Sequence, residues 1–295
     1  MTPRKTVLVA GAQGQLGQAI VMLAPQDLQI IALNRAQLDI TQAAQVDDAL
    51  GHYKPQVVIN AAAYTAVDKA ESDVEQAFAI NADGARHVAA AASRHGAWPI
   101  HISTDFVFAG QQCTPYSVDA PVAPLGAYGR SKAAGEQGVR EASDGAASIL
   151  RTAWVYGPVQ QNFLRTMLRL LAERPQLRVV SDQLGTPTST HSIARALFAM
   201  MAEDIGRGQI LHWTDAGVAS WFDFACAVRS AAVAVEGTHR WGTVAPIRTA
   251  DYPTPAQRPA YSVLDPDVEL AAAVPRPWWL EEVQRIVPLA LAAGV

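Results

Sequence analysis

The stretch TVLVAGAQGQLG, residues 6–17, decides the fold class of this 295-residue chain. Its first half, Thr6–Ala10, has the apolar, β-branched composition of a buried strand, and the residues after the glycines have a helical pattern. Between the two, Gly11, Gly14 and Gly17 recur at every third position. This spacing suits a tight turn whose backbone can approach a phosphate, with a helix N-terminus directed at it. The stretch therefore predicts a strand, a glycine turn and a helix that bind the pyrophosphate of a dinucleotide.

The same alternation of strands and helices continues through the first half of the chain. Further strands are expected at Leu28–Asn34, Gln56–Ala63, Pro99–Asp105 and within Ala147–Gly157, with a long helix at roughly Asp73–His95. Nearly all-apolar strands that alternate with helices are typical of a parallel sheet covered on both faces. We therefore expect an α/β fold with a Rossmann-like, doubly wound parallel sheet.

The pattern changes after Pro158, where a helix near Asn162–Glu173 is followed by shorter, proline-rich segments. We interpret residues 1–160 as a dinucleotide-binding Rossmann domain, to which residues 176–203 return. Residues 161–295 are expected to form mainly a smaller, mixed substrate-binding lobe that is interleaved with this domain.

Composition and charge argue against several classes of function. The chain is 50% hydrophobic and 17% charged, and its net charge of -4 gives no general attraction to nucleic acid or to an anionic membrane. The two cysteines, Cys113 and Cys226, lack metal-ligand spacing and fit a reducing cytoplasm. The N-terminal apolar run breaks into glycine and predicts a strand, not a signal peptide. The C-terminal run IVPLALAAG is too short to cross a bilayer.

The end of the expected second strand bears on the choice of cofactor. In dinucleotide folds an acidic residue roughly 20 positions after the glycine turn usually binds the ribose hydroxyls of NAD. This chain has Asn34 and Arg35 there. A carboxylate would repel a 2′-phosphate, whereas this pair would not. The pair favours NADPH and leaves NADH open; the alternative is that Arg35 simply points into water.

Tyr128 and Lys132, in AYGRSKAAGE, lie four residues apart and so share one face of an expected helix. An ammonium close to a phenol lowers the phenol pKa from about 10, which makes it a better proton donor to a carbonyl oxygen. Ser103 and Thr104 lie at the carboxyl end of an expected strand, where doubly wound sheets bind ligands. A hydroxyl at this point could hydrogen-bond the same oxygen. Alone, the Tyr–Lys spacing is common by chance and more often belongs to a solvated helix face.

Several motifs occur in an order that resembles the extended short-chain dehydrogenases/reductases. They are the glycine turn, INAAAYTAVDKAE (59–71), STDFVF (103–108), YGRSK (128–132), RTAWVYG (151–157) and RPAYSVLD (258–265). Within that superfamily the chain is most similar to the dTDP-4-dehydrorhamnose reductases, over essentially its whole length. The resemblance implies reduction of the 4-ketone of dTDP-6-deoxy-L-lyxo-4-hexulose by NADPH or NADH. The product would be dTDP-L-rhamnose, a precursor of cell-surface polysaccharides.

The resemblance also implies roles for individual residues. Tyr128 would donate the proton, Lys132 would lower its pKa and hold the nicotinamide ribose, and Thr104 would orient the ketone oxygen. The residues expected along the cofactor, besides Tyr128 and Lys132, are Gly11, Gln13, Gly14, Gln15, Leu16, Gly17, Asn34, Arg35, Asp39, Ile40, Ala62, Ala63, Tyr64 and Thr65. Those expected at the substrate are Val67, Thr104, Asp105, Trp154 and Arg258.

Three of the implied roles have plain structural alternatives. Asn81 either fixes the backbone near the site or is a tolerated polar residue within a helix. Arg258 either clamps a diphosphate with its planar fork or forms an interdomain salt bridge. Trp154 either touches the sugar or belongs to the core.

The sequence departs from the family pattern at two positions. Some members are thought to dimerise around magnesium held by carboxylates, and the matching residues here are Ala19 and His191. Neither is the anionic oxygen ligand that magnesium prefers. We therefore expect no bound metal, and a monomer or weak homodimer.

Two other functions stay open from the sequence. One is another nucleotide-sugar enzyme, such as a 4-epimerase that keeps a tightly held NAD. The other is a non-catalytic NADP-binding regulatory subunit, like the relatives that serve methionine adenosyltransferase. The intact set Thr104, Tyr128 and Lys132 favours the reductase, because a regulator needs no tuned phenol.

Overall fold

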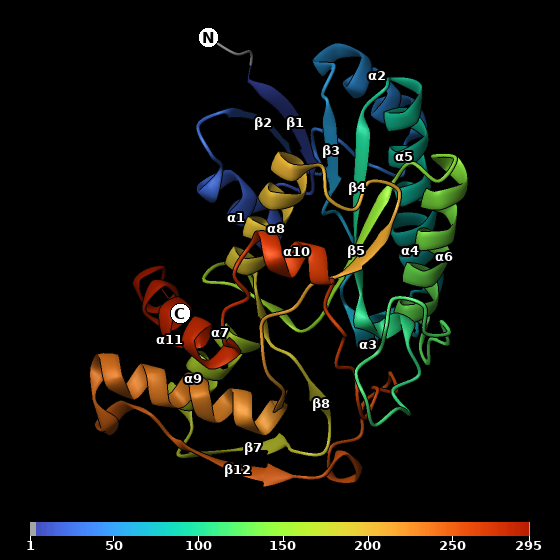
Figure 1. Ribbon diagram of the computed structural model, residues 1–295. Coiled ribbons are helices and arrows are strands. Elements are labelled where there is room, and N and C mark those ends of the chain that lie inside the picture. The colour runs from blue at the N-terminus through green and yellow to red at the C-terminus, as the bar shows by residue number, and fades with distance from the viewer. Residues whose placement is uncertain (1–3, 295) are drawn as a thin grey trace.

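The computed structural model describes residues 4–294. Residues 1–3 of the expected dinucleotide-binding domain and residue 295 of the expected lobe lie outside this described part. Within it, six parallel strands form one central sheet, as Figure 1 shows. These strands are β1 (Lys5–Ala10), β2 (Leu28–Leu33), β3 (Val57–Asn60), β4 (Trp98–Thr104), β5 (Ser148–Thr152) and β10 (Ile210–His212). The expected doubly wound α/β fold is confirmed.

The order of the strands defines the end of the sheet at which a ligand can bind. From edge to edge the order is β10-β5-β4-β3-β1-β2, so the progress of the chain across the sheet reverses between β1 and β3. Doubly wound sheets bind ligands outside the carboxyl ends of the strands, at such a reversal. Gly11 directly follows β1, and Ala61 directly follows β3. The glycine turn therefore lies at the reversal point.

Helices cover both faces of this sheet (Figure 1). On one face lie α1 (Gln15–Leu23) and α8 (Thr190–Glu203), and on the other α2 (Ala43–Tyr53), α5 (Ala85–Arg94) and α6 (Ala127–Ala142). A strand that is covered on both faces needs apolar residues at every position. The pattern VLVA of β1 meets this requirement, because all four residues are fully buried.

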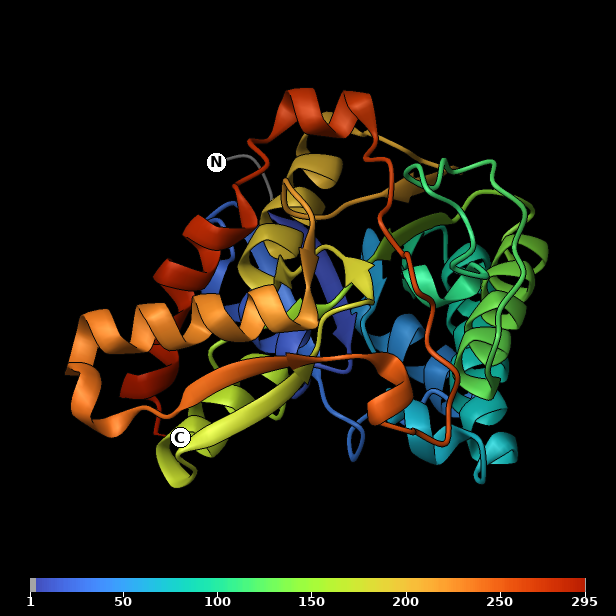
Figure 2. The ribbon, with the colours of Figure 1, turned by 90° about the horizontal axis from the view of Figure 1, so that it is seen from below.

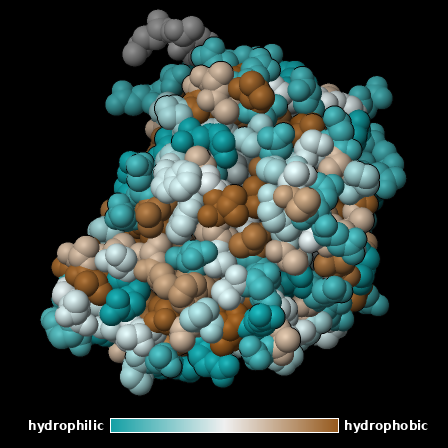
Figure 3. Space-filling model, turned by 60° about the horizontal axis from the view of Figure 1, so that its bottom comes forward, coloured by the Kyte–Doolittle hydropathy of each residue, from teal (hydrophilic) through white to brown (hydrophobic). Residues whose placement is uncertain are grey.

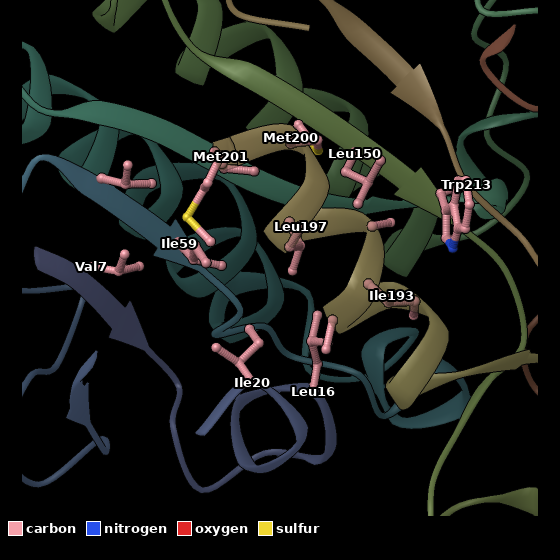
Figure 4. Packing of buried hydrophobic residues seen from close by; sticks show 14 of the residues in the cluster. Val7, Leu16, Ile20, Ile59, Leu150, Ile193, Leu197, Met200, Met201 and Trp213 are labelled. Carbon is pink, nitrogen blue, oxygen red and sulfur yellow. The ribbon is translucent and has the colours of Figure 1, made fainter. Parts of the chain in front are cut away.

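The core between the sheet and the α1–α8 pair is aliphatic. Figure 4 shows Leu16 and Ile20 of α1 and Leu197 of α8 near Val7 and Ile59 of the sheet. Each of these five side chains is at most 8% exposed. Burying one such side chain stabilises the fold by about 1.5–3 kcal/mol. This packing holds the first turn of α1 in place, and with it the glycine turn.

A smaller lobe lies below the sheet in Figure 1 and has a hydrophobic core of its own. Its elements are α7 (Phe163–Glu173), β7 (Gln176–Val180), α9 (Trp221–Glu236), β12 (Thr243–Ile247) and α11 (Trp279–Ala292). The short strands β6 (Val155–Tyr156), β8 (Leu184–Gly185), β9 (Thr188–Ser189) and β11 (Ala219–Ser220) lie in the connections. The expected helix near Asn162 is thus present, with the Asn162 side chain accepting a hydrogen bond from the Arg165 backbone.

The return to the central sheet starts later than expected. Residues 176–203 include β7, which pairs in parallel with β12 and not with the central sheet. The side chains of β7 alternate partly between exposed and buried, as suits a strand with one covered face. The segment that returns to the sheet begins with α8 and ends with β10.

The chain after β12 runs back between the two parts of the molecule, as the orange-red segment in Figure 2 shows. It forms isolated bridges from Tyr261 to Leu184 of the lobe and from Leu264 to Tyr116 of the larger domain. It then continues into α10 (Val268–Ala273), which packs on α8. The segment that carries RPAYSVLD is thereby held against both parts.

The long helix expected at roughly Asp73–His95 is interrupted by a π-helical turn. It consists of α4 (Val74–Phe78), the π-helix Ala79–Gly84 and α5, after the short α3 (Val67–Ala70). π-helical turns are rare in proteins, and those that occur are often found at functional sites. Here it carries Asn81, whose contacts are described below.

No helix within residues 4–294 is both long and apolar enough to cross a membrane. Figure 3 shows the face of the molecule that is turned forward from below. On it, hydrophobic and hydrophilic residues are interspersed, and the brown areas stay small.

Candidate active site

A cavity of about 230 Å³ opens at the carboxyl ends of β1, β2 and β3. Its lining consists of Gly11, Gln13, Gly14, Arg35, Leu38, Asp39, Ile40, Ala61, Ala62, Ala63 and Ile80. Half of the sixteen residues expected along the cofactor thus surround one space. Leu38, Ala61 and Ile80 were not anticipated from the sequence; they are apolar and carry no motif of their own.

The glycine turn brings backbone close to backbone. A Cβ atom at Gly11 would lie 2.6 Å from the Ala62 nitrogen, and one at Gly17 would lie 2.5 Å from the Gly11 oxygen. Gly11 also has a φ of 82°, a left-handed value that favours glycine. Only glycine therefore permits this turn between β1 and α1.

The first turn of α1 fits an anion. The helix begins after Gly14, which offers no side chain to cap the first N–H groups. Uncapped N–H groups and the positive end of the helix dipole attract a phosphate. Leu16 contributes only its backbone here, because its side chain is packed in the core. The residues present therefore fit the pyrophosphate of a dinucleotide.

The end of β2 places one cation at the cavity. Arg35 lines it with a side chain that is 72% exposed, and its Nε lies 3.9 Å from Oδ2 of Asp39. Burial acts to raise the pKa of Asp39, but hydrogen bonds from Thr41 outweigh it and the pKa is lowered. Asn34 differs from expectation: its side chain accepts hydrogen bonds from the backbones of Ala36 and Gln37. Asn34 therefore shapes the turn that presents Arg35 and does not itself line the cavity.

Asn81 fixes the loop that follows β3. Its Oδ1 accepts from the Tyr64 nitrogen at 2.8 Å, and its Nδ2 donates to the Tyr64 oxygen and to the Ser131 hydroxyl, both at 3.0 Å. The backbone of Tyr64 is thus tied to α6 through one buried amide. The Tyr64 ring points elsewhere, because its hydroxyl donates to Asp73. Neither Tyr64 nor the exposed Thr65 lines the cavity.

Thr104 and Tyr128 meet beyond the carboxyl end of β4. Thr104 is the last residue of β4, and Tyr128 lies in the first turn of α6. Burial raises the pKa of Tyr128 to about 12, and the charge of Asp105 adds to the rise, while the Thr104 hydroxyl beside the phenol works against it. Phe106 supports the phenol ring edge-on at 5.6 Å. The phenol is therefore fully protonated at neutral pH.

Asp105 differs from expectation. It was expected at the sugar, but it is 1% exposed, and its Oδ1 accepts a hydrogen bond from the Thr104 hydroxyl at 3.0 Å. Burial raises the pKa of Asp105 to about 6, against the lowering effect of the Ser262 and Thr104 hydroxyls. Asp105 therefore acts on the site through Thr104.

Lys132 is buried and turned toward the sheet. Its Nζ donates to the Ile102 carbonyl oxygen at 2.7 Å and lies 3.2 Å from Nε2 of His101. Burial lowers the pKa of Lys132 to about 8, although Glu136 acts to raise it. The expected lowering of the Tyr128 pKa by this ammonium is not seen in this arrangement, where burial decides the pKa of both groups.

Ser103, the other candidate hydroxyl, faces away from the site. Neighbouring residues of a strand point to opposite faces, and Ser103 donates to Oε1 of Glu136 at 2.5 Å. Glu136 also forms a two-pronged ion pair with Arg151, at 2.9 and 2.7 Å. Ser103 thus belongs to a buried polar cluster that joins β4, β5 and α6, and it is not available to a ketone.

Trp154 lies just after β5, which pairs with β4, the strand that ends in Thr104. Its φ of 45° is left-handed, which is uncommon for a bulky residue. The indole stacks on Trp221 with ring centroids 3.5 Å apart, and a Cβ at Gly185 would lie 2.4 Å from it. Such strain is typical of functional positions. Trp221, the first residue of α9, was missed in the sequence because nothing there links it to Trp154.

Arg258 forms the interdomain contact that was its structural alternative. Its Nη2 donates to Oδ2 of Asp68 at 2.7 Å, which links the segment after β12 to α3. Val67 begins the same short helix and is partly exposed. Since a guanidinium has five donors, Arg258 retains others for an anionic ligand.

Ala19 and His191 both lie in the interior. Ala19 is 3% exposed between α1 and α8, and His191 is 7% exposed in the first turn of α8. Across the part of the chain that the structure describes, no three or more His, Cys, Asp or Glu side chains gather as a metal site would require.

The sheet order, the glycine cradle and a threonine–tyrosine pair beyond β4, with a lysine one turn along α6, define a protein of the short-chain dehydrogenase/reductase class. A family model described as the RmlD substrate binding domain matches residues 5–290. The chain therefore belongs to this family.

Individual relatives resemble the chain over most of their length. The dTDP-4-dehydrorhamnose reductase of Sinorhizobium fredii is 41% identical over 294 residues, covering 97% of this chain and 98% of that protein. A probable dTDP-4,6-dihydroxy-2-methyloxan-3-one 4-ketoreductase of Streptomyces antibioticus is 42% identical, covering 88% and 86%. The solved dTDP-4-dehydrorhamnose reductase of Bacillus anthracis, in complex with NADP, is 35% identical with a TM-score of 0.89, covering 96% and 98%.

Proposed function

We propose that this protein is a dTDP-4-dehydrorhamnose reductase that uses NADPH to reduce the 4-ketone of dTDP-6-deoxy-L-lyxo-4-hexulose to dTDP-L-rhamnose. The observation that carries the proposal is the meeting of Thr104 and a protonated Tyr128 at the carboxyl end of β4, next to a cavity that fits a dinucleotide. Relatives that bear this name are similar to the chain along nearly its whole length. The reaction would supply an activated deoxysugar for cell-surface polysaccharide.

In this reaction Tyr128 gives its proton to the ketone oxygen. Reduction needs a phenol that is still protonated when the substrate arrives, and the pKa of about 12 provides it. Thr104 would orient the same oxygen by turning to it the one proton that its hydroxyl gives to Asp105 Oδ1 in this structure. When bound, NADPH supplies the hydride for the ketone carbon.

Lys132 stabilises the phenolate that Tyr128 becomes. An ammonium about 4 Å from an anion interacts with it by roughly 4 kcal/mol at an effective dielectric constant near 20. Its three donors also suit a ribose hydroxyl. In this structure Nζ is engaged with Ile102 and His101, so this role requires the side chain to turn along α6.

We propose NADPH over NADH because Arg35 is the cation at the end of β2. Its exposed guanidinium suits the planar recognition of a 2′-phosphate. The pyrophosphate would lie on the uncapped first turn of α1. Ala62 and Ala63, held through Asn81, would line the rest of the cofactor.

The remaining parts of the proposal concern the lobe and the assembly. Residues 1–160 would bind the dinucleotide, with α8 and β10 completing that domain, and the lobe would bind the dTDP-sugar together with Trp154 and Val67 of the larger domain and with Arg258. We propose a monomer or weak homodimer that needs no metal, since the family's magnesium carboxylates are Ala19 and His191 here. We also propose a cytoplasmic location, where the free cysteines would stay reduced.

The test is to incubate the purified protein with the dTDP-hexulose and either NADPH or NADH. Loss of the reduced-nicotinamide absorbance and chromatographic identification of dTDP-L-rhamnose are expected, faster with NADPH. Cofactor oxidation without substrate, or a product that differs from the substrate only by epimerisation, would contradict the proposal. Binding of NADPH without turnover would point instead to a regulatory protein.

A further inference from the structure

A chain of buried polar groups leads from the cofactor loop to Lys132. Asn60 ends β3, His101 lies in the middle of β4 and Lys132 lies on α6; each is at most 3% exposed. Asn60 Nδ2 lies 3.2 Å from His101 Nδ1, and His101 Nε2 lies 3.2 Å from Lys132 Nζ. The imidazole therefore bridges an amide and an amine.

The direction of these hydrogen bonds follows from the loop. The Ala62 backbone nitrogen donates to Asn60 Oδ1 at 3.2 Å, so Oδ1 faces the loop and Nδ2 faces His101. An amide Nδ2 only donates, and Nδ1 of His101 must accept from it. Burial holds the pKa of His101 well below its ordinary value, so the ring is neutral. A neutral imidazole that accepts at Nδ1 carries its single proton on Nε2.

The Nε2 proton points at the lysine nitrogen. An ammonium has three donors and no lone pair, whereas an unprotonated amine has one lone pair and can accept. Opposite the Nε2–H of His101, a neutral Lys132 amine therefore accepts a hydrogen bond. An ammonium would instead place one of its own N–H donors against the Nε2–H donor. On its own helix α6, Glu136 is the charged group that acts on Lys132, and Tyr128 lies one turn before it; Asp105, which follows β4, acts on Tyr128. Glu136 is already engaged by Arg151 and Ser103.

We propose that His101 is a positioning residue for Lys132, and that in the buried position its Nε2 proton favours the neutral amine over the ammonium. Lys132 then takes up a proton from solvent when it turns from His101 to a ribose hydroxyl of the bound cofactor. The second step rests on the proposed function; the first does not. The consequence is that the charge which stabilises the Tyr128 phenolate is completed only when cofactor is bound.

The first test reads the charge of Lys132 directly. The chain has only four lysines, Lys5, Lys54, Lys69 and Lys132, and the first three are exposed. NMR of protein labelled with 13C at lysine Cε therefore gives few signals, and Lys132→Arg assigns the buried one. We expect the Lys132 signal to titrate at lower pH than the other three. His101→Gln, which offers a carbonyl acceptor to an ammonium, should raise that midpoint by about one pH unit or more.

The matched control is His239→Gln, which alters an exposed histidine of the lobe and should leave the Lys132 midpoint unchanged. An unchanged or lowered midpoint in His101→Gln would overturn the proposal. A second measurement needs no variant: 15N shifts of the histidine rings distinguish the tautomers. The proposal requires the Nε2–H form of His101 in the unaltered protein, and the Nδ1–H form would overturn it even if His101→Gln failed to fold.

The coupling to the cofactor is tested by calorimetry of NADPH binding in two buffers with different ionisation enthalpies, at a pH near the Lys132 midpoint. Proton uptake is expected in the unaltered protein and should be smaller in His101→Gln. Equal uptake in both would refute the coupling. Absence of NADPH binding would refute the proposed function but leave the tautomer and the titration as they are.

Discussion

Removing Arg151 should destabilise the protein far more than removing an arginine from a surface pair. Arg151 and Glu136 are 2% and 5% exposed, and Arg151→Met would leave the Glu136 carboxylate with the Ser103 hydroxyl as its remaining donor. Breaking a buried pair on one side typically costs about 3–5 kcal/mol, because an uncompensated charge stays in the interior. Arg151 also donates to the Val118 oxygen and lies 5.1 Å over the Phe108 ring, so further contacts are lost. A loss of this size is a large part of the roughly 5–15 kcal/mol that stabilises a domain.

The measurement is urea unfolding at neutral pH, read as a shift of the midpoint at constant slope. The matched control is Arg169→Met, since the Arg169–Glu173 pair has side chains 53% and 52% exposed and should contribute no more than about 1 kcal/mol. The double variant Glu136→Leu/Arg151→Met should recover much of the loss, because no charge is left unpaired.

A cavity of about 740 Å³ beside α6 bears on the outcome, since Glu136 and Arg151 are among its lining residues. If Arg151→Met cost no more than Arg169→Met, water would reach the carboxylate through that cavity. The reasoning from burial would then be wrong.

The remaining predictions concern catalysis, the cofactor, metal and pH. Tyr128→Phe should keep the fold and NADPH binding but reduce turnover by about 10²–10⁴-fold, as expected for a lost general acid. Thr104→Val should reduce turnover by about tenfold or less, because a neutral hydrogen bond contributes about 0.5–1.5 kcal/mol. Steady-state kinetics in which Thr104→Val is the more damaging change would contradict the mechanism. Arg35→Asp should raise the KM for NADPH much more than that for NADH, and equal changes would show that Arg35 does not contact the 2′-phosphate. Activity should survive EDTA, and a loss that magnesium restores would contradict the role given to Ala19 and His191. Burial raises the pKa of Asp215 to about 7, above its value in the unfolded chain. Its contribution to stability is therefore present below about pH 4 and is lost as pH rises through about 7. Asp215→Asn should flatten this decline in stability, measured by urea unfolding at several pH values, and an unchanged profile would show that Asp215 does not titrate as proposed.

The sequence predicts the central sheet well because its strands depend on local chemistry. A strand such as VLVA, covered on both faces, must be apolar throughout. Gly11 and Gly17 are required because a Cβ atom at either position would lie within 2.6 Å of backbone. Both requirements lead to residues of a fixed type at a fixed spacing within one segment of the sequence. The cavity residues that follow β1, β2 and β3 could therefore be placed by counting from the strand ends.

The errors arise where a second segment decides what a side chain does. Ser103 and Thr104 look alike in the sequence, and only the packing of α6 places Glu136 where Ser103 binds it. Asn34 was expected along the cofactor, but its side-chain amide closes its own turn. Residues 176–203 were expected to return to the central sheet, yet β7 within them pairs with β12, which comes more than 60 residues later in the chain. Trp221 and His101 were missed for the same reason, although a histidine inside an apolar strand is itself a signal that a buried partner is needed.

The pKa values of the site indicate why reduction suits it. A phenol held permanently beside an ammonium would be a stronger acid, but part of it would already be ionised before a ketone arrived, and an ionised phenol cannot donate. In this structure burial raises the pKa of Tyr128 to about 12, and the amino group that would lower it lies against Ile102 and His101. The acid is thus kept protonated first and strengthened second, when Lys132 turns toward the cofactor. If the two events are separate, the pH dependence of turnover should follow the group that moves, Lys132, and should shift in His101→Gln while the KM for the sugar stays unchanged. A shift in the KM alone would mean that His101 shapes the pocket and does not control the charge.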